Sequence, residues 1–408
     1  MTFKHTVTAA VCAAAVLASS GAALAATSPS APSKSTGRGT IVSTTRLPQL
    51  SAGEIKSALK QAGFDASQVR YGVDAYRIVY RTIDQNGAAT TASGFVGLPR
   101  NHQHRLRAVT YDHGTMAGAS EAPSVDDGGR SVEGLTLASA GFLAVAPDYL
   151  GLGVGPGHHP YLQVTTEITT TLDMLRAART LAVSQHRSID PSVYAAGFSQ
   201  GGQAAMAFSK AMQAGLDRSF RVAAVAPISG PYRIADAELP AMLSGQLDPI
   251  ESAYYIGYVF TAWNRLYHLY DKPSDVFRAP YDKTVAPLYD GKHTDDVIFA
   301  ALPKSYEQLL TPAALAQLAH PTGNLAKALR TNDVSCDWTP RIPVHLFAAH
   351  GDKDVAIQNS YLCQQQLTEH GTPDVSLTDM GNVLHSDSGR RGFAGALRWF
   401  LAGAPRSS

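Results

Sequence analysis

Short apolar runs alternate with helix-like stretches along most of the chain, from Leu47 onward. Strands covered on both faces read as such nearly continuous apolar runs, and helices show a 3.6-residue periodicity. Strands that alternate with helices favour βαβ units and a mostly parallel sheet, so we predict an α/β fold. The predicted strands are AYRIVYRTI, TTASGFVGLP, RAVTYD, GFLAVAP, SVYAAGF, RVAAVAP and PVHLFAAH, and the predicted helices include Tyr161–Ala182, Gln200–Ala214 and Arg390–Leu401.

The alternation stops between Pro231 and Pro340, where the periodicity looks helical. This segment holds 9 of the 17 tyrosines and separates two predicted strands. We therefore predict a helical cap at 231–340, inserted into a core formed by 46–230 and 341–408. Most of its aromatic side chains are expected to form the cap's own core, with the lining of a substrate cleft as the alternative.

The N-terminal region resembles an export signal. An apolar run from Ala9 to Leu17 is followed by small residues, with Ala23 and Ala25 in an A-x-A arrangement. The run is shorter than the roughly 20 residues that span a bilayer. We predict a signal peptide at 1–25, a Ser/Thr/Pro/Gly-rich linker at 26–45 and a secreted protein without a transmembrane segment. A single membrane anchor is the alternative to the signal peptide, and the periplasm is the alternative compartment.

Two of the three cysteines, Cys336 and Cys363, lie beyond the predicted signal peptide. An even pair in an exported chain indicates one disulfide. Two unpaired buried thiols are the alternative.

The run GFSQGG contains a G-x-S-x-G pentapeptide from Gly197 to Gly201, with Ser199 at its centre. It follows the predicted strand SVYAAGF and opens a predicted helix, which is the strand–turn–helix setting of a nucleophilic serine. The helix N-terminus also directs free N–H groups toward developing negative charge. An ordinary glycine-rich loop is the alternative.

On these motifs the chain resembles the α/β-hydrolase family, and within it the secreted bacterial lipases and esterases with a helical cap. The resemblance extends from about Arg107 to Leu401 and implies a nucleophile, an acid and a histidine in that order. His385, in DMGNVLHSDSG, lies where the family places its base. The family pattern G-x-x-D in HGDKDV selects Asp354 as the acid, with Asp352 as the alternative.

The run RAVTYDHGTMAG resembles the oxyanion loop of lipases and esterases. The resemblance implies that backbone N–H groups of Gln200 and of Thr115 or Met116 bind the oxyanion, and a plain turn is the alternative. In the later run PDYLGLGVG, Asp148 and Tyr149 are expected to support this loop.

The resemblance implies a serine carboxylic-ester hydrolase, a lipase or carboxylesterase, that acts on a small-molecule or lipid ester through an acyl-enzyme. An aminopeptidase of the same fold, or a non-catalytic secreted binding protein, is the alternative. The net charge of +1 gives no basis for nucleic-acid binding. We expect no metal or other cofactor, and the sequence leaves the oligomeric state open.

Overall fold

Nine strands form one sheet in the computed structural model, which describes residues 37–128, 131–371 and 374–404. The strand order is β1-β2-β3-β5-β4-β6-β7-β8-β9. The five pairings from β5 to β9 are parallel, whereas β1, β2, β3 and β5 pair antiparallel. The strands are β1 (Ile41–Arg46), β2 (Val73–Ile83), β3 (Ala89–Pro99), β4 (Arg105–Asp112), β5 (Leu143–Pro147), β6 (Ser188–Phe198), β7 (Arg221–Ile228), β8 (Val344–Ala348) and β9 (Val375–Asp379).

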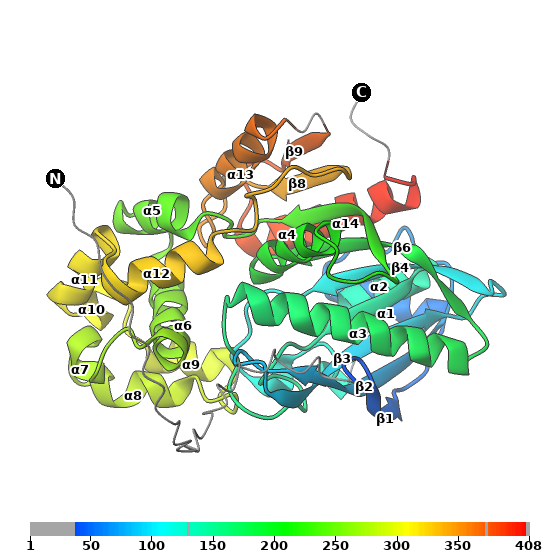
Figure 1. Cartoon of the computed structure of the whole chain (residues 1–408), viewed down its shortest axis with the longest axis horizontal. Helices are drawn as coiled ribbons and strands as arrows, with labels where there is room; N and C mark the ends of the chain where they lie inside the picture. The colour runs from blue at the N-terminus through cyan, green and yellow to red at the C-terminus, as the bar shows by residue number, and fades with distance from the viewer. Residues whose placement is uncertain (1–36, 129–130, 372–373, 405–408) are drawn as a thin grey trace, which may run out of the picture. The chain divides into compact units, whose positions relative to one another are not determined.

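Helices cover both faces of this sheet (Figure 1). One face packs against α3 (Val164–Ser184), α4 (Gln200–Gln213) and α13 (Gln358–Glu369). The other packs against α1 (Ala52–Gln61), α2 (Val132–Ser139) and α14 (His385–Leu401). All five residues of β5 are buried, as expected for a central strand covered on both sides. The predicted mostly parallel α/β sheet is therefore confirmed.

Two predicted boundaries were wrong. The linker prediction extended to residue 45, but Ile41–Arg46 forms the edge strand β1, which pairs with β2. Its polar, exposed residues gave no apolar signal, and the partner strand supplies the hydrogen bonds. The final helix begins at His385 rather than at Arg390. The predicted signal peptide and the first part of the linker lie outside the described residues.

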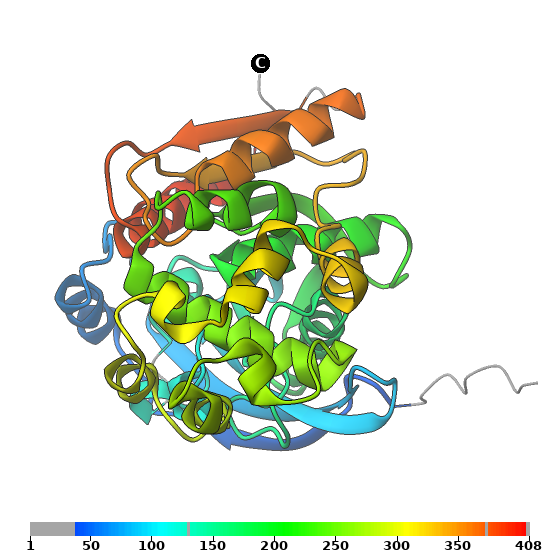
Figure 2. The same ribbon diagram turned by 90° about the vertical axis from the view of Figure 1, so that its left-hand side faces the viewer.

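Between β7 and β8 the described structure has helices and no strand, with one isolated β-bridge between Phe277 and Leu310. The helices pack around a separate apolar core that contains Tyr254, Tyr258, Trp263 and Tyr289. Figure 2 shows these cap helices in front of the sheet. They are a π-helical turn (Ile234–Glu238), α5 (Leu239–Leu243), α6 (Pro249–Tyr267), α7 (Pro273–Val276), α8 (Tyr281–Leu288), α9 (Asp295–Ala301), α10 (Tyr306–Leu309), α11 (Pro312–Ala319) and α12 (Gly323–Asn332).

A disulfide joins Cys336, which follows the last cap helix, to Cys363 in α13. Both sulfurs lie in the apolar core beneath α13. Within the described residues, no helix has the length and apolarity needed to cross a membrane.

Candidate active site

The pentapeptide forms a sharp turn between β6 and α4, with Ser199 at its apex. Ser199 has φ 56° and ψ −121°, a strained conformation for a residue with a side chain. A Cβ on Gly197 would lie 2.0 Å from the Gly201 carbonyl oxygen, and one on Gly201 would lie 1.9 Å from the Asp112 carbonyl oxygen. Both positions therefore require glycine, and the turn presents Ser199 at the carboxyl edge of the sheet.

His385 lies at the start of α14, and its Nδ1 is 2.7 Å from Oδ2 of Asp352. The expectation that Asp354 would contact this ring is contradicted by the structure. Oδ1 of Asp352 accepts hydrogen bonds from the backbone N–H groups of Asp354 and Val355, which orients its other oxygen toward His385. Oδ2 of Asp354 instead accepts a hydrogen bond from the hydroxyl of Tyr255, in the cap. The G-x-x-D spacing thus selected the aspartate of this loop that does not contact His385.

Burial alone would lower the pKa of His385, but the hydrogen bond and negative charge of Asp352, with the charges of Asp354 and Glu238, raise it above its usual value. The ring packs 4.5 Å from the ring of Phe198, centroid to centroid. Its Nε2 is buried and has no hydrogen-bond partner among the described residues. Ser199 and His385 line the same cavity. The two ring nitrogens therefore differ, because Nδ1 bonds Asp352 and Nε2 has no partner among the described residues.

The predicted oxyanion loop follows β4 and lies against the serine turn. A Cβ on Gly114 would be 3.5 Å from Cβ of Ser199, so the two backbones are close neighbours. Thr115 and Met116 line the cavity that contains Ser199 and His385. Gln200 is the first residue of α4, where a backbone N–H has no acceptor within the helix. These are the positions that the sequence predicted for oxyanion binding.

Both the core and the cap hold this loop in place. Tyr149 donates a hydrogen bond to the carbonyl of His113, while Asp148 accepts hydrogen bonds from Ser93 and Ser124. From the cap, the carboxylate of Asp295 accepts a hydrogen bond from the backbone N–H of Ala117 at 2.9 Å. The contact of Tyr149 agrees with the support expected from the sequence, whereas the contact from Asp295 in the cap was not predicted.

The chain is similar in structure to known hydrolases. The chain aligns with a protein from Legionella pneumophila, named a hydrolase by inference, at a TM-score of 0.82 and 26% identity, covering 90% of this chain and 99% of the other. It aligns with the rice cell wall degrading esterase LipA from Xanthomonas oryzae at a TM-score of 0.79 and 26% identity, covering 90% and 100%. Candida antarctica lipase A aligns at a TM-score of 0.65 with 12% identity, covering 91% and 84%, which is a likeness of fold alone. No family model matches the sequence, and no curated protein matches it.

This chain has the α/β-hydrolase fold. Its nearly full-length structural similarity to a named esterase and to a lipase agrees with the resemblance that the sequence motifs gave.

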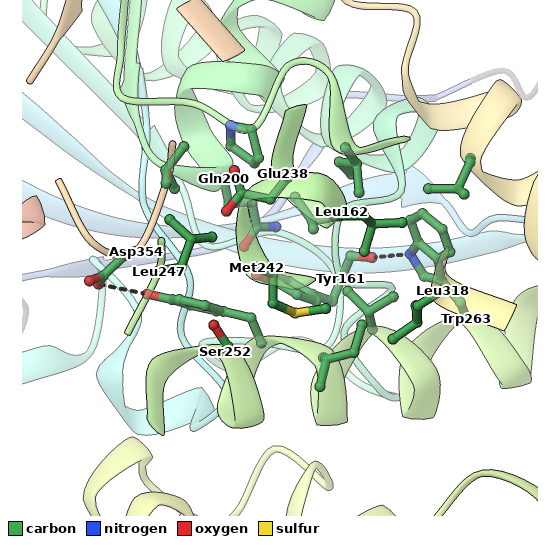
Figure 3. Close-up of a pocket in the computed structure, with 18 of the residues that line it drawn as sticks. Tyr161, Leu162, Gln200, Glu238, Met242, Leu247, Ser252, Trp263, Leu318 and Asp354 are labelled. Atoms are coloured by element: carbon green, nitrogen blue, oxygen red, sulfur yellow. Dashed lines mark hydrogen bonds between the residues drawn. The ribbon is translucent and has the colours of Figure 1, made fainter. Parts of the chain in front are cut away.

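A largely apolar cavity lies between the α/β-hydrolase core and the cap, next to Ser199 and Gln200 (Figure 3). Its volume is about 80 Å³. In Figure 3, Leu162 and Met242 face this space, with Trp263 at one end and Asp354 at the other. Of the nine cap tyrosines, only Tyr255 lines the cavity, so the expectation that most cap aromatics pack within the cap agrees with the structure.

Sequence reasoning missed a buried network behind Gln200. Its side-chain Nε2 donates to Oε1 of Glu167 at 2.8 Å and lies 2.9 Å from Nε2 of His159. Burial raises the pKa of Glu167 to about 8 and lowers the pKa of His159 to about 3, so both are uncharged near neutral pH. Glu167 lies in helix α3, and in the sequence it looks like any other polar residue of a helix. No signal in the sequence connects it to Ser199.

The described residues contain no group of three or more histidine, cysteine or acidic side chains arranged to hold a metal ion. His159 is one of two adjacent histidines, with His158. In the structure, Nδ1 of His159 faces the carbonyl of Leu150 at 3.0 Å, and its other nitrogen faces Gln200. Its surroundings are those of a structural histidine.

Proposed function

We propose that this chain is an exported serine hydrolase that cleaves carboxylic esters, of a small-molecule or lipid substrate, through a covalent acyl-serine intermediate. The observation that carries the proposal is that Ser199, His385 and Asp352 lie together at one site. Ser199 at the strained turn shares a cavity with His385, whose far ring nitrogen bonds Asp352. A serine hydroxyl is a weak nucleophile at neutral pH and needs such a base.

In the proposed reaction, Oγ of Ser199 attacks the ester carbonyl carbon as Nε2 of His385 takes the hydroxyl proton. The negative charge that develops on the carbonyl oxygen is bound by the N–H of Gln200 and by that of Thr115 or Met116; each such donor contributes on the order of 3 kcal/mol. The imidazolium then protonates the departing alcohol. Water attacks the acyl-serine with His385 again as base, which releases the acid and restores Ser199.

Asp352 is the acid in this proposal, in place of Asp354. Its bond to Nδ1 fixes the tautomer that leaves Nε2 free to accept a proton, and its charge stabilises the imidazolium.

An assay of 4-nitrophenyl esters of increasing acyl length tests this proposal. We expect hydrolysis by the wild type and a loss of at least 10³-fold in Ser199→Ala. A fluorophosphonate probe should label the wild type at Ser199 and leave Ser199→Ala unlabelled. Absence of both hydrolysis and labelling in a folded wild type would reject a catalytic serine and favour a non-catalytic binding role.

A second candidate is hydrolysis of aminoacyl amides. Asp354 lines the cavity next to Ser199, and in this alternative its carboxylate binds the ammonium group of the substrate. Aminoacyl 4-nitroanilides assayed beside the esters distinguish the two functions. The apolar lining of the rest of the cavity favours the ester.

Export is proposed on two grounds. These are the disulfide, which forms in oxidising compartments, and the signal-like sequence of 1–25. Mass spectrometry of the protein purified from its native host should give an N-terminus at Ala26. An intact N-terminus would reject cleavage at that site.

A further inference from the structure

Two cavities meet at the nucleophile. The apolar cavity extends under the cap, and the second extends along the oxyanion loop. Among the described residues, only Ser199 and Tyr255 line both cavities. Tyr255 therefore lines both cavities beside Ser199, where the scissile bond of a substrate would lie.

The proposed chemistry assigns one side of the ester to each cavity. His385 must protonate the leaving oxygen, so the alcohol has to lie on the side of His385. His385 lines only the second cavity, which also contains polar groups such as Thr115 and Glu121. The acyl chain then occupies the apolar cavity under the cap, among side chains such as Leu247 and Met242.

The side chain of Tyr255 is held by a hydrogen bond from the cap to the core and by a ring contact within the cap. Tyr255 lies in α6, and its hydroxyl donates to Oδ2 of Asp354 at 3.2 Å; in Figure 3 this is the dashed line that ends on Asp354. Burial and the charge of Asp354 raise the pKa of Tyr255, so the hydroxyl stays protonated and keeps donating. The ring also packs edge-on against Tyr254, at 5.3 Å between centroids. Asp354 thus holds the hydroxyl end of a side chain that lines both cavities.

We propose that Tyr255 is the specificity-determining residue that separates the acyl compartment from the alcohol compartment, and that Asp354 is the residue that positions it. The proposal rests on the ester-hydrolase function proposed above. A ring fixed beside the scissile bond limits the bulk that a substrate can carry on the carbon next to the carbonyl. Linear acyl chains pass this ring, whereas chains branched at that carbon collide with it.

The test compares kcat/KM for 4-nitrophenyl butanoate and 4-nitrophenyl 2-methylbutanoate, which differ by one methyl group next to the carbonyl. One methyl group changes kcat/KM by roughly 10- to 200-fold in a tight site. We expect Tyr255→Ala to raise the ratio of kcat/KM for the branched ester to kcat/KM for the linear ester by about tenfold. Tyr255→Phe keeps the ring but loses the bond, so a rise of about two- to threefold is expected.

A double-mutant comparison tests the positioning role of Asp354. If Asp354 acts only by holding the hydroxyl, then Asp354→Ala, Tyr255→Phe and the double variant should give the same substrate ratio within about twofold. The matched control is Tyr289→Phe, which removes another buried cap hydroxyl, one that donates to the carbonyl of Tyr254 and lines neither cavity. This control should keep the wild-type ratio.

Fluorophosphonate titration counts the active sites, so a poorly folded variant does not distort the comparison. An unchanged ratio in Tyr255→Ala, with ester hydrolysis intact in the wild type, overturns the role of Tyr255 alone. A wild type that hydrolyses no ester overturns the proposed function itself. A ratio in Asp354→Ala that differs from that of Tyr255→Phe rejects the positioning role of Asp354.

Discussion

At the residue scale, two aspartates separated by one position have different partners. Asp352 bonds the ring of His385, and Asp354 bonds the hydroxyl of Tyr255. The backbone of the loop decides between them, because its N–H groups of Asp354 and Val355 bond the carboxylate of Asp352. Sequence spacing cannot distinguish side chains that leave one loop in different directions.

This difference predicts unequal effects of two equivalent substitutions. Asp352→Asn should lower kcat by about 10³- to 10⁴-fold, because the amide favours the wrong tautomer of His385. Asp354→Asn should cost less than tenfold, since the amide oxygen still accepts from Tyr255. Steady-state kinetics on a 4-nitrophenyl ester measures both, and a larger loss in Asp354→Asn would restore Asp354 as the acid.

The pH dependence of kcat/KM should report His385. Its pKa is raised, so the base is lost to protonation at a higher pH than for a free histidine, near 6.5. Activity should therefore rise with pH, with a midpoint above about 6.5. Because the charge of Asp354 contributes to the raised pKa, Asp354→Asn should move the midpoint to lower pH. A profile that is flat between about pH 5 and 8 would exclude a histidine base.

At the element scale, the loop between β8 and α13 is held by the cap. The backbone N–H of Asp248 donates to the carbonyl of Lys353 at 2.7 Å, and Oε2 of Glu238 accepts from the N–H of Ala356. The disulfide adds a covalent link between α13 and the segment that returns from the cap. The position of Asp352 thus depends on elements that are distant in sequence.

Removal of the disulfide should destabilise the chain. The bond closes a loop of 27 residues, for which chain-entropy arguments give roughly 3 to 4 kcal/mol. We expect Cys336→Ala/Cys363→Ala to lower the free energy of unfolding by about this amount in urea denaturation. A reducing agent should destabilise the wild type similarly and leave the double variant unchanged; equal sensitivity of both proteins to reduction would contradict the role of the bond.

At the scale of the whole molecule, buried ionisable groups link stability to pH. Burial raises the pKa of Glu167 from 4.5 to about 8. Between these values the folded state keeps a proton that the unfolded state loses, so the contribution of Glu167 to stability falls as pH rises. His159 acts in the opposite direction, because its pKa is lowered to about 3 and acid favours its unfolded, charged form.

A matched variant isolates the contribution of Glu167. Glu167→Gln keeps the size of the side chain but does not titrate, so Tm should fall less between pH 5 and 8 than in the wild type. The comparison rests on the difference between the two proteins, since His159 contributes equally to both. Parallel Tm curves across this range would show that Glu167 is ionised in the folded protein.

The sequence alone determined the sheet, the cap and the serine turn, because these depend on local patterns. Apolar runs identify buried strands, and the glycines flanking Ser199 are required by backbone contacts within one turn. The tertiary structure alone decided that Asp352 contacts His385, that Ile41–Arg46 is a strand, that Glu167 bonds the side chain of Gln200, and that Tyr255 lines the site. Each of these depends on a partner distant in the chain, and a hydrogen bond across such a distance leaves no periodic trace in the sequence.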